Sequence, residues 1–260
     1  GKTVIEEFVD KHDGDVFEVI SKEMSFNVVI GNCNFIGYID RVDRTPNGGV
    51  LITDYKTTTT ARLTTDGSDA YGSTSTPTGM VTSAPTSNTG ANLRMVGFKK
   101  ESPTSVNQEA CATWTEGDAG ISQPGVALRI AAAPSRVRAI TVTNNILYGA
   151  RRVFNIHLGD TTAKTNMVPV GSRSFEWAPA PLPWRFCARA EGTHITMKVW
   201  PVAGVASIPG WDDPAFTAKA SVPPEWVYAG RPGWYVGHLA AGQRLVSSDL
   251  AVSALPSSSA

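Results

Sequence analysis

The sequence predicts a mainly β protein in which a large β-sandwich follows a small, partial α/β segment. From residue 92 onward, short runs rich in Val, Ile, Phe, Trp and Thr recur, and Gly, Pro, Asn or Asp separates most of them. Strands spaced by about 8–12 residues with such turn signals are typical of a sandwich or barrel. Apolar and polar residues also alternate well over 184–200, and the composition changes sharply after residue 57.

Composition and charge are those of a globular protein. Of the 260 residues, 42% are apolar and 18% are charged, and the net charge is zero. The charge is uneven, because residues 1–57 hold 6 Lys/Arg and 10 Asp/Glu, a net of −4, which leaves +4 on the remainder. An acidic N-terminal segment repels DNA phosphates unless metal ions offset its charge.

The number of cysteines and the hydropathy of the sequence argue against a disulfide-rich, zinc-binding or membrane-spanning protein. The three cysteines are Cys33, Cys111 and Cys187, an odd number without CxxC spacing. We therefore expect neither a disulfide framework nor a zinc site, although Cys111 and Cys187 could pair if their strands are neighbours. No run of 18 apolar residues occurs, and no signal peptide is visible, so no membrane span is expected.

The first 57 residues read as one small unit. Residues 1–10 are compatible with a helix, and Val16–Ile20 and Met24–Ile30 with short strands. Clearer strands follow at Phe35–Val42 and Val50–Tyr55. The Thr-Pro-Asn-Gly-Gly sequence at 45–49 is strong turn chemistry, which predicts that these two strands form a hairpin.

The rest of the chain divides by composition. Residues 58–91 are dominated by Thr, Ser, Gly and Pro, which predicts a linker or a loop. Residues 92–254 are assigned to the sandwich, and the Ser-rich residues 255–260 to a disordered tail. The sandwich strands are expected at Leu93–Phe98, Ala110–Trp114, Val126–Ala131, Val137–Thr143, Arg152–Leu158, Ser174–Trp177, Trp184–Ala190, His194–Trp200, Gly233–Leu239 and Arg244–Val252.

Acidic residues gather on the predicted hairpin. If the turn 45–49 closes it, Arg44 pairs with Val50, and counting outward places Asp40 opposite Asp54. Strand parity puts Lys56 on the same face. Two carboxylates at opposed positions, with Cβ atoms about 4.5–5.5 Å apart, destabilise a hairpin unless a cation lies between them. Mg²⁺ prefers carboxylates and would relieve this repulsion, and a neighbouring lysine could orient a metal-bound water.

These residues resemble a known family of nucleases. The sequences Gly-Tyr-Ile-Asp-Arg-Val-Asp at 37–43 and Asp-Tyr-Lys-Thr at 54–57 resemble the motifs of the PD-(D/E)xK superfamily, particularly its RecB-type exonuclease branch. The resemblance implies that Asp40 and Asp54 are metal ligands and that Lys56 is the catalytic lysine. Glu23, on the preceding strand, is a candidate auxiliary metal ligand, and the implied cofactor is Mg²⁺.

The sequence departs from this family after the lysine. The family core continues with a helix, often carrying a Gln-x-x-x-Tyr motif, and then a further strand. Here residues 57–60 are a run of four threonines, and no Gln-x-x-x-Tyr follows. A sheet without its covering helix leaves one face bare, so we expect a truncated nuclease core.

The later part of the chain resembles another family. The Trp184–Trp200 segment, the Pro-Gly-Trp-Asp-Asp sequence at 209–213 and the Gly230–Leu239 segment resemble concanavalin A-like, laminin G-like sandwich modules. Such modules recur in extracellular proteins and in minor tail proteins of phages. The resemblance spans about 92–253 and implies display or adhesion.

Candidate ligand-binding residues lie in one loop of this region. Trp211 could stack on a sugar ring, and Asp212 and Asp213 could bind hydroxyl groups or Ca²⁺. The alternatives are that the tryptophan packs in the protein and that the aspartates cap a turn. No catalytic signature is visible in the sandwich, because its carboxylates do not form the convergent pair that a glycosidase requires.

We therefore expect a non-enzymatic structural or adhesion protein, on a virion or another extracellular surface, that binds a glycan or a partner protein and that could be a homo-oligomer. The alternative is a cytoplasmic, Mg²⁺-dependent DNA exonuclease with an appended sandwich.

Overall fold

The computed structural model describes residues 18–30, 33–44, 48–53, 58–64, 71–75, 79–84, 86, 93–117, 122–146, 152–178 and 180–256. They fold into two compact units, Gly1–Lys56 and Thr57–Ala260. The helix expected over residues 1–10 lies outside the described residues. Within them, no helix is long and apolar enough to cross a membrane.

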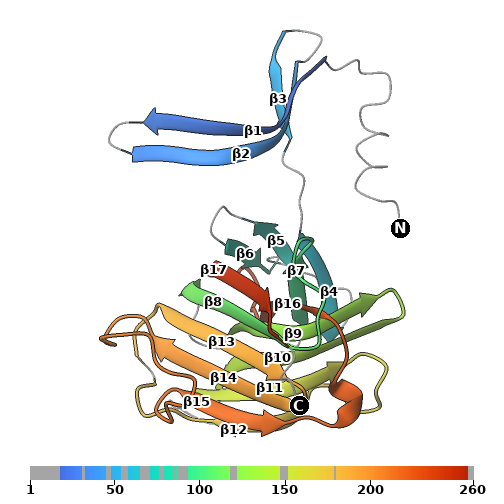
Figure 1. The fold of residues 1–260 in the computed structure, drawn as a ribbon, viewed down its shortest axis with the longest axis vertical. Helices are drawn as coiled ribbons and strands as arrows, with labels where there is room; N and C mark the ends of the chain where they lie inside the picture. The colour runs from blue at the N-terminus through green and yellow to red at the C-terminus, as the bar shows by residue number, and fades with distance from the viewer. Residues whose placement is uncertain are drawn as a thin grey trace. The chain divides into compact units, whose positions relative to one another are not determined.

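The first unit contains an antiparallel sheet of three strands in the order β1-β2-β3 (Figure 1). The two short strands expected before residue 31 form one strand, with a register shift between Val19 and Ser21. The hairpin expected around residues 45–49 is present as β2 and β3. The bounds are β1 (Glu18–Ile30), β2 (Cys33–Arg44) and β3 (Val50–Thr53).

The second unit is the expected β-sandwich, built from two seven-stranded antiparallel sheets (Figure 1). The first sheet has the order β12 (Val168–Arg173), β11 (Arg152–Asp160), β10 (Arg136–Ile146), β9 (Gln123–Ala133), β16 (Arg231–Gly237), β7 (Arg94–Lys99) and β4 (Thr58–Thr64). The second has the order β15 (Thr217–Ser221), β14 (His194–Pro201), β13 (Trp184–Glu191), β8 (Gln108–Gly117), β17 (Arg244–Ala254), β6 (Gly79–Ser83) and β5 (Gly72–Ser75). A short 3₁₀-helix, η1, spans Pro224–Trp226.

The expectation of a linker over residues 58–91 is wrong, because β4, β5 and β6 belong to the sandwich. Threonine is β-branched and favours strands, so a Thr-rich run is compatible with a sheet. β4 and β5 lie at the edges of their sheets, where polar side chains reach solvent. The strand expected at Ser174–Trp177 is also wrong, because these residues follow β12 as a loop.

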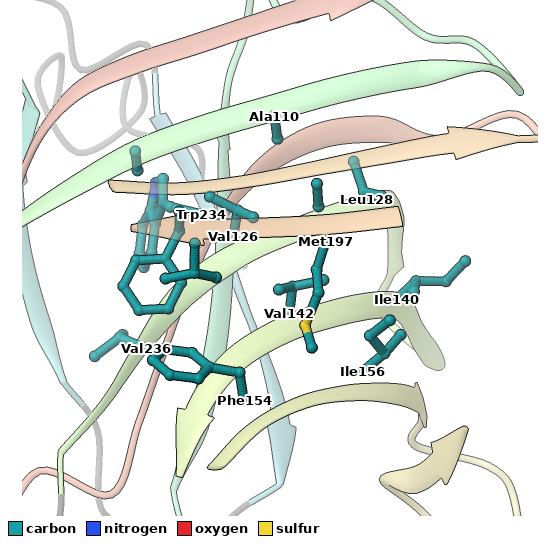
Figure 2. Packing of buried hydrophobic residues seen from close by; sticks show 14 of the residues in the cluster. Ala110, Val126, Leu128, Ile140, Val142, Phe154, Ile156, Met197, Trp234 and Val236 are labelled. Atoms are coloured by element: carbon teal, nitrogen blue, oxygen red, sulfur yellow. The ribbon is translucent and has the colours of Figure 1, made fainter. Parts of the chain in front are cut away.

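The core lies between the two sheets and follows the alternation of their strands (Figure 2). On β13, the side chains of Trp184, Phe186 and Ala188 are buried in it, whereas Arg185 and Arg189 are partly exposed on the other face. The close-up shows residues from β8, β9, β10, β11, β14 and β16 meeting in one layer: Ala110, Val126, Leu128, Ile140, Val142, Phe154, Ile156, Met197, Trp234 and Val236.

A disulfide joins Cys111 on β8 to Cys187 on β13, the pair that the sequence left open as an alternative to the absence of disulfides. The two residues are direct partners in the antiparallel register, so the fold brings them together over 76 positions of sequence. They lie outside the main core, in a small buried cluster with Trp200.

The start of the expected disordered tail is ordered. The Leu255 amide donates a hydrogen bond to the Asn107 carbonyl oxygen, and Asn107 Nδ2 donates one to the Pro256 carbonyl oxygen. Residues 257–260 lie outside the described part of the chain.

Candidate functional site

The β2–β3 hairpin has the register expected from its turn. Arg44 pairs with Val50, and the pairing continues to Arg41 opposite Thr53. One more step of this register would place Asp40 opposite residue 54. Residues 54–57 lie outside the described residues, so the roles of Asp54 and Lys56 stay predictions.

Glu23 and Asp40 occupy facing positions on β1 and β2. The flanking pairs are Lys22 with Arg41 and Met24 with Ile39, so residues 23 and 40 stand opposite each other. Two carboxylate residues at facing positions are suitable donors for Mg²⁺. Across the described residues, no group of three or more His, Cys, Asp or Glu side chains is placed to hold a metal ion.

Trp211 already has two cationic neighbours. The Arg189 guanidinium carbon lies 4.3 Å from the centre of a Trp211 ring, and Lys198 Nζ lies 4.4 Å from it. Lys198 is buried and donates a 2.8 Å hydrogen bond to the Pro209 carbonyl oxygen. Cation–π contacts of this kind hold the indole against the protein, so the Trp211 ring packs against side chains of β13 and β14.

The neighbouring aspartates belong to a turn. Asp213 Oδ1 accepts a 2.9 Å hydrogen bond from the Ala215 amide, and the Asp213 carbonyl oxygen accepts one from Thr217 Oγ1. This is the local capping that aspartate commonly provides in turns. Asp212 is exposed. These contacts favour the turn-capping alternative for Asp213.

A pocket of about 450 Å³ lies at one end of the first sandwich sheet. Three arginines line it: Arg136 and Arg138 at the start of β10, and Arg231 at the start of β16. Its apolar wall comes from β7, the end of β9 and the residues before β16, namely Phe98, Ile130, Ala131, Ala132, Ala133 and Ala229. The described lining residues include no carboxylate, histidine, serine or cysteine.

The sequence contains only a weak signal for this pocket. Arg136 and Arg138 are two residues apart, a spacing that puts both on one face of a strand. Arg231 is about 90 positions away in sequence, on a strand that pairs with β9. Only the non-local pairing of β16 with β9 brings the three guanidinium groups into one pocket.

The fold and these sites define a two-unit protein: a small acidic sheet with facing carboxylate positions, and a disulfide-linked sandwich with a cationic pocket. A family model described as the PD-(D/E)XK nuclease superfamily matches residues 2–135, just over half of the chain. The chain therefore belongs to the PD-(D/E)XK nuclease superfamily. The matched residues include the three-stranded sheet and continue through β4–β9 of the sandwich unit.

Solved structures show limited similarity to this chain. A protein of unknown function from Saccharomyces cerevisiae has 8% identity and a TM-score of 0.47, over 78% of this chain and 100% of that one. The exoplasmic/lumenal domain of VIP36, bound to Ca²⁺ and Man3GlcNAc, has 7% identity and a TM-score of 0.44, over 74% and 85%. The enzymatically active domain of tailspike protein 2 of bacteriophage CBA120 has 11% identity and a TM-score of 0.43, over 80% and 30%.

All three TM-scores are below 0.5, so the activities of these proteins are not transferred to this chain. No curated protein sequence matches it significantly.

Proposed function

We propose that this chain is a non-enzymatic adhesion protein whose laminin G-like sandwich binds a glycan. The observation that carries this proposal is the pocket lined by Arg136, Arg138 and Arg231. Its volume of about 450 Å³ is in the range of small-ligand sites, roughly 300–1,000 Å³. A stable protein partner would instead require an interface of about 800 Å² on each side.

The chemistry of the lining favours binding over catalysis. Glycoside hydrolysis uses two convergent carboxylic acids, and nucleophilic catalysis uses a group such as Ser or Cys beside a base. The described lining residues include no carboxylate, Ser or Cys, and the hydroxyl of Thr104 has no basic partner such as His or a carboxylate among them. Arginine donors above an apolar wall suit the hydroxyl groups and the CH face of a sugar.

The Cys111–Cys187 disulfide supports a location on a virion or another extracellular surface. Structural disulfides persist in oxidising surroundings and are rare in the reducing cytosol. This disulfide is largely buried beside Trp200, as expected of a structural bond.

A glycan array probed with the full chain tests this function. We expect a restricted set of sugars to bind, and Ala132→Trp, which places an indole at an exposed position of the pocket lining, to weaken binding at least tenfold. Ala203→Trp is the matched control, because Ala203 is exposed and is not among the described lining residues. An array without any binding sugar, or equal losses in the two variants, would reject the proposal.

The family match favours a second candidate function, Mg²⁺-dependent DNA cleavage by the first unit. Asp40, Asp54 and Glu23 would hold the ion, whose contribution when bound is to stabilise negative charge on the scissile phosphate. Lys56 would orient the attacking water. The facing positions of Glu23 and Asp40 support this donor set.

Degradation of fluorescently labelled DNA in the presence of Mg²⁺ tests the second candidate. We expect Lys56→Ala to abolish any cleavage, whereas Lys164→Ala, at an exposed position of the sandwich, leaves it unchanged. Calorimetric titration of Mg²⁺ into Asp40→Asn provides a readout independent of activity. Cleavage that survives Lys56→Ala would rule out this unit as its source.

A further inference from the structure

The arginine pocket carries a net positive charge. Asp160 is the carboxylate bound to these arginines: its Oδ2 lies 2.5 Å from Arg136 Nη2 and 3.4 Å from Arg138 Nε. The hydrogen bond from Arg136 holds the pKa of Asp160 well below its ordinary value, so this carboxylate is ionised at neutral pH. Three guanidinium charges against one carboxylate leave a net charge of about +2.

The arginines are held in place by contacts that use only part of their hydrogen-bonding capacity. The Arg138 guanidinium carbon lies 4.3 Å from the Trp226 ring and 4.4 Å from the Tyr228 ring, and its Nη2 donates to the Glu225 carbonyl oxygen at 3.0 Å. Its Nε is buried and faces Asp160 Oδ2, so it is not available to a ligand. A guanidinium group has five N–H donors, so Arg138 retains donors at Nη1 and Nη2 for a ligand.

Arg231 is fixed in a comparable way. Its Nη1 donates to the carbonyl oxygens of Lys100, at 2.9 Å, and Ser102. Its guanidinium carbon lies 5.5 Å from the Phe98 ring. Among the described residues, neither its Nε nor its Nη2 makes a hydrogen bond, whereas Arg136 donates from Nε and Nη2 to Asp160. Pre-organised guanidinium groups lose little entropy when they bind an anion, which favours affinity.

The apolar part of the pocket lining indicates which type of molecule bears the anionic group of the ligand. Ile130 and Ala131 provide an apolar surface next to the cationic groups. A sugar ring bearing a carboxylate or phosphate presents an apolar CH face and an anionic edge, which match both parts of the pocket. A nucleic acid fits less well, because its bases need open aromatic faces for stacking and the Phe98 ring already lies near Arg231.

We infer that the ligand is an anionic glycan whose carboxylate or phosphate group is bound by Arg138 and Arg231, with Arg136 beside them. This inference rests on the proposed glycan-binding function. It further specifies that the pocket selects a negatively charged sugar. Guanidinium groups pair with both kinds of anion in bidentate geometry.

Calorimetry with three matched trisaccharides tests the inference on the full chain: a galacturonic acid trimer, a galactose trimer and a galactose 6-phosphate trimer. We expect one or both charged trimers to bind at least tenfold more tightly than the neutral trimer, with affinity that falls as salt is raised. The relative affinity of the two charged trimers identifies the preferred anion.

Two variants locate the binding, and one variant controls for charge. Arg231→Gln removes a guanidinium, and Ala132→Glu adds a carboxylate at an exposed lining position, so each should weaken binding of the charged trimers at least tenfold. Arg244 and its partner Glu116 both lie on the second sheet, away from the pocket, and the Arg244 side chain is 57% exposed. Arg244→Gln should therefore leave the affinity for the charged trimers unchanged. Thermal unfolding of each variant verifies its fold, and Ala132→Glu remains informative if Arg231→Gln unfolds.

The outcomes separate this inference from the proposed function. Preferential binding of the neutral trimer would overturn the anion inference and leave glycan binding intact. Failure of all three trimers, together with an empty glycan array, would reject both. Tighter binding of a 20-nucleotide DNA strand that is lost in the same two variants would overturn the inference in favour of a nucleic-acid site.

Discussion

Arg129 Nη1 donates a 2.6 Å hydrogen bond to the carbonyl oxygen of Trp226, although the two residues are 97 positions apart. The Arg129 side chain is fully buried, and burial lowers the pKa of its guanidinium group. Its other donors reach the carbonyl oxygens of Val106, at 3.0 Å, and Gly192, at 2.5 Å. One arginine therefore joins β9 to η1 and to the two loops that contain Val106 and Gly192.

Replacement of this arginine should destabilise the sandwich strongly. Arg129→Met would remove the donor from one buried and two partly buried carbonyl oxygens, and a buried group left unsatisfied costs about 1–3 kcal/mol. Because the chain can relax, we expect a loss of about 3 kcal/mol in the free energy of unfolding, measured by urea denaturation. Arg244→Met, at an exposed position, should change it by less than about 0.5 kcal/mol. Equal effects of the two variants would contradict the role of Arg129.

The disulfide should contribute substantially to the stability of the second unit. It closes a loop with a sequence separation of 76, for which chain entropy predicts about 4.5 kcal/mol as an upper value. We expect the double variant Cys111→Ala/Cys187→Ala to lower the free energy of unfolding by about 2–4 kcal/mol. Alkylation of the unfolded chain, followed by mass spectrometry, should label one cysteine without reductant and three with it.

Cys33→Ala is the control for this prediction, because Cys33 lies on β2 in the other unit. It should leave the unfolding of the sandwich unchanged and remove the label found without reductant. Labelling of all three cysteines without reductant would show that the disulfide does not form.

Local patterns in the sequence were sufficient to predict part of this fold. The alternation over 184–200 predicted which β13 side chains enter the core, and the turn at 45–49 predicted that Arg44 pairs with Val50. Both features depend on neighbouring residues, since strand parity and turn length fix them.

The features that the sequence left open depend on distant pairings. β16 lies between β9 and β7, and β17 lies between β8 and β6, orders that adjacent residues do not encode. Arg129 has a φ of 50°, next to irregularities in the pairing of β9 with β10 and with β16, and nothing in its local sequence marks that conformation. The arginine pocket and the disulfide both follow from such pairings.

The stability of the sandwich should fall between pH 7 and pH 5 because of His157. Burial, with a smaller effect of the Arg94 charge, lowers the pKa of His157 from 6.5 to about 4. The His157 side chain therefore becomes protonated near pH 6.5 in the unfolded chain but only near pH 4 in the folded chain. Stability is full above pH 6.5 and is lost as the pH falls through this window, by about 2 kcal/mol at pH 5.

His157→Gln isolates this contribution. Its free energy of unfolding from urea titrations should change less between pH 7 and pH 5 than that of the parent chain, by about 2 kcal/mol. Asp160 does not interfere, because its lowered pKa removes stability only as the pH falls below the unfolded value of about 3.8. An identical pH dependence in the two proteins would contradict the assignment to His157.

Gly97 should be indispensable for the packing of Trp234. The two residues are direct partners across β7 and β16, and a Cβ atom added to Gly97 would lie 2.1 Å from Trp234 Cζ2. Gly97→Ala must therefore displace a tryptophan that is only 4% exposed, and overpacking of this kind costs about 1–3 kcal/mol. Gly72→Ala is the matched control, because a Cβ atom added to Gly72 would have the Ser83 carbonyl oxygen, at 4.0 Å, as its nearest neighbour.

In thermal unfolding, we expect a clear decrease in the midpoint for Gly97→Ala and little change for Gly72→Ala. Equal midpoints would show that the indole has room to move.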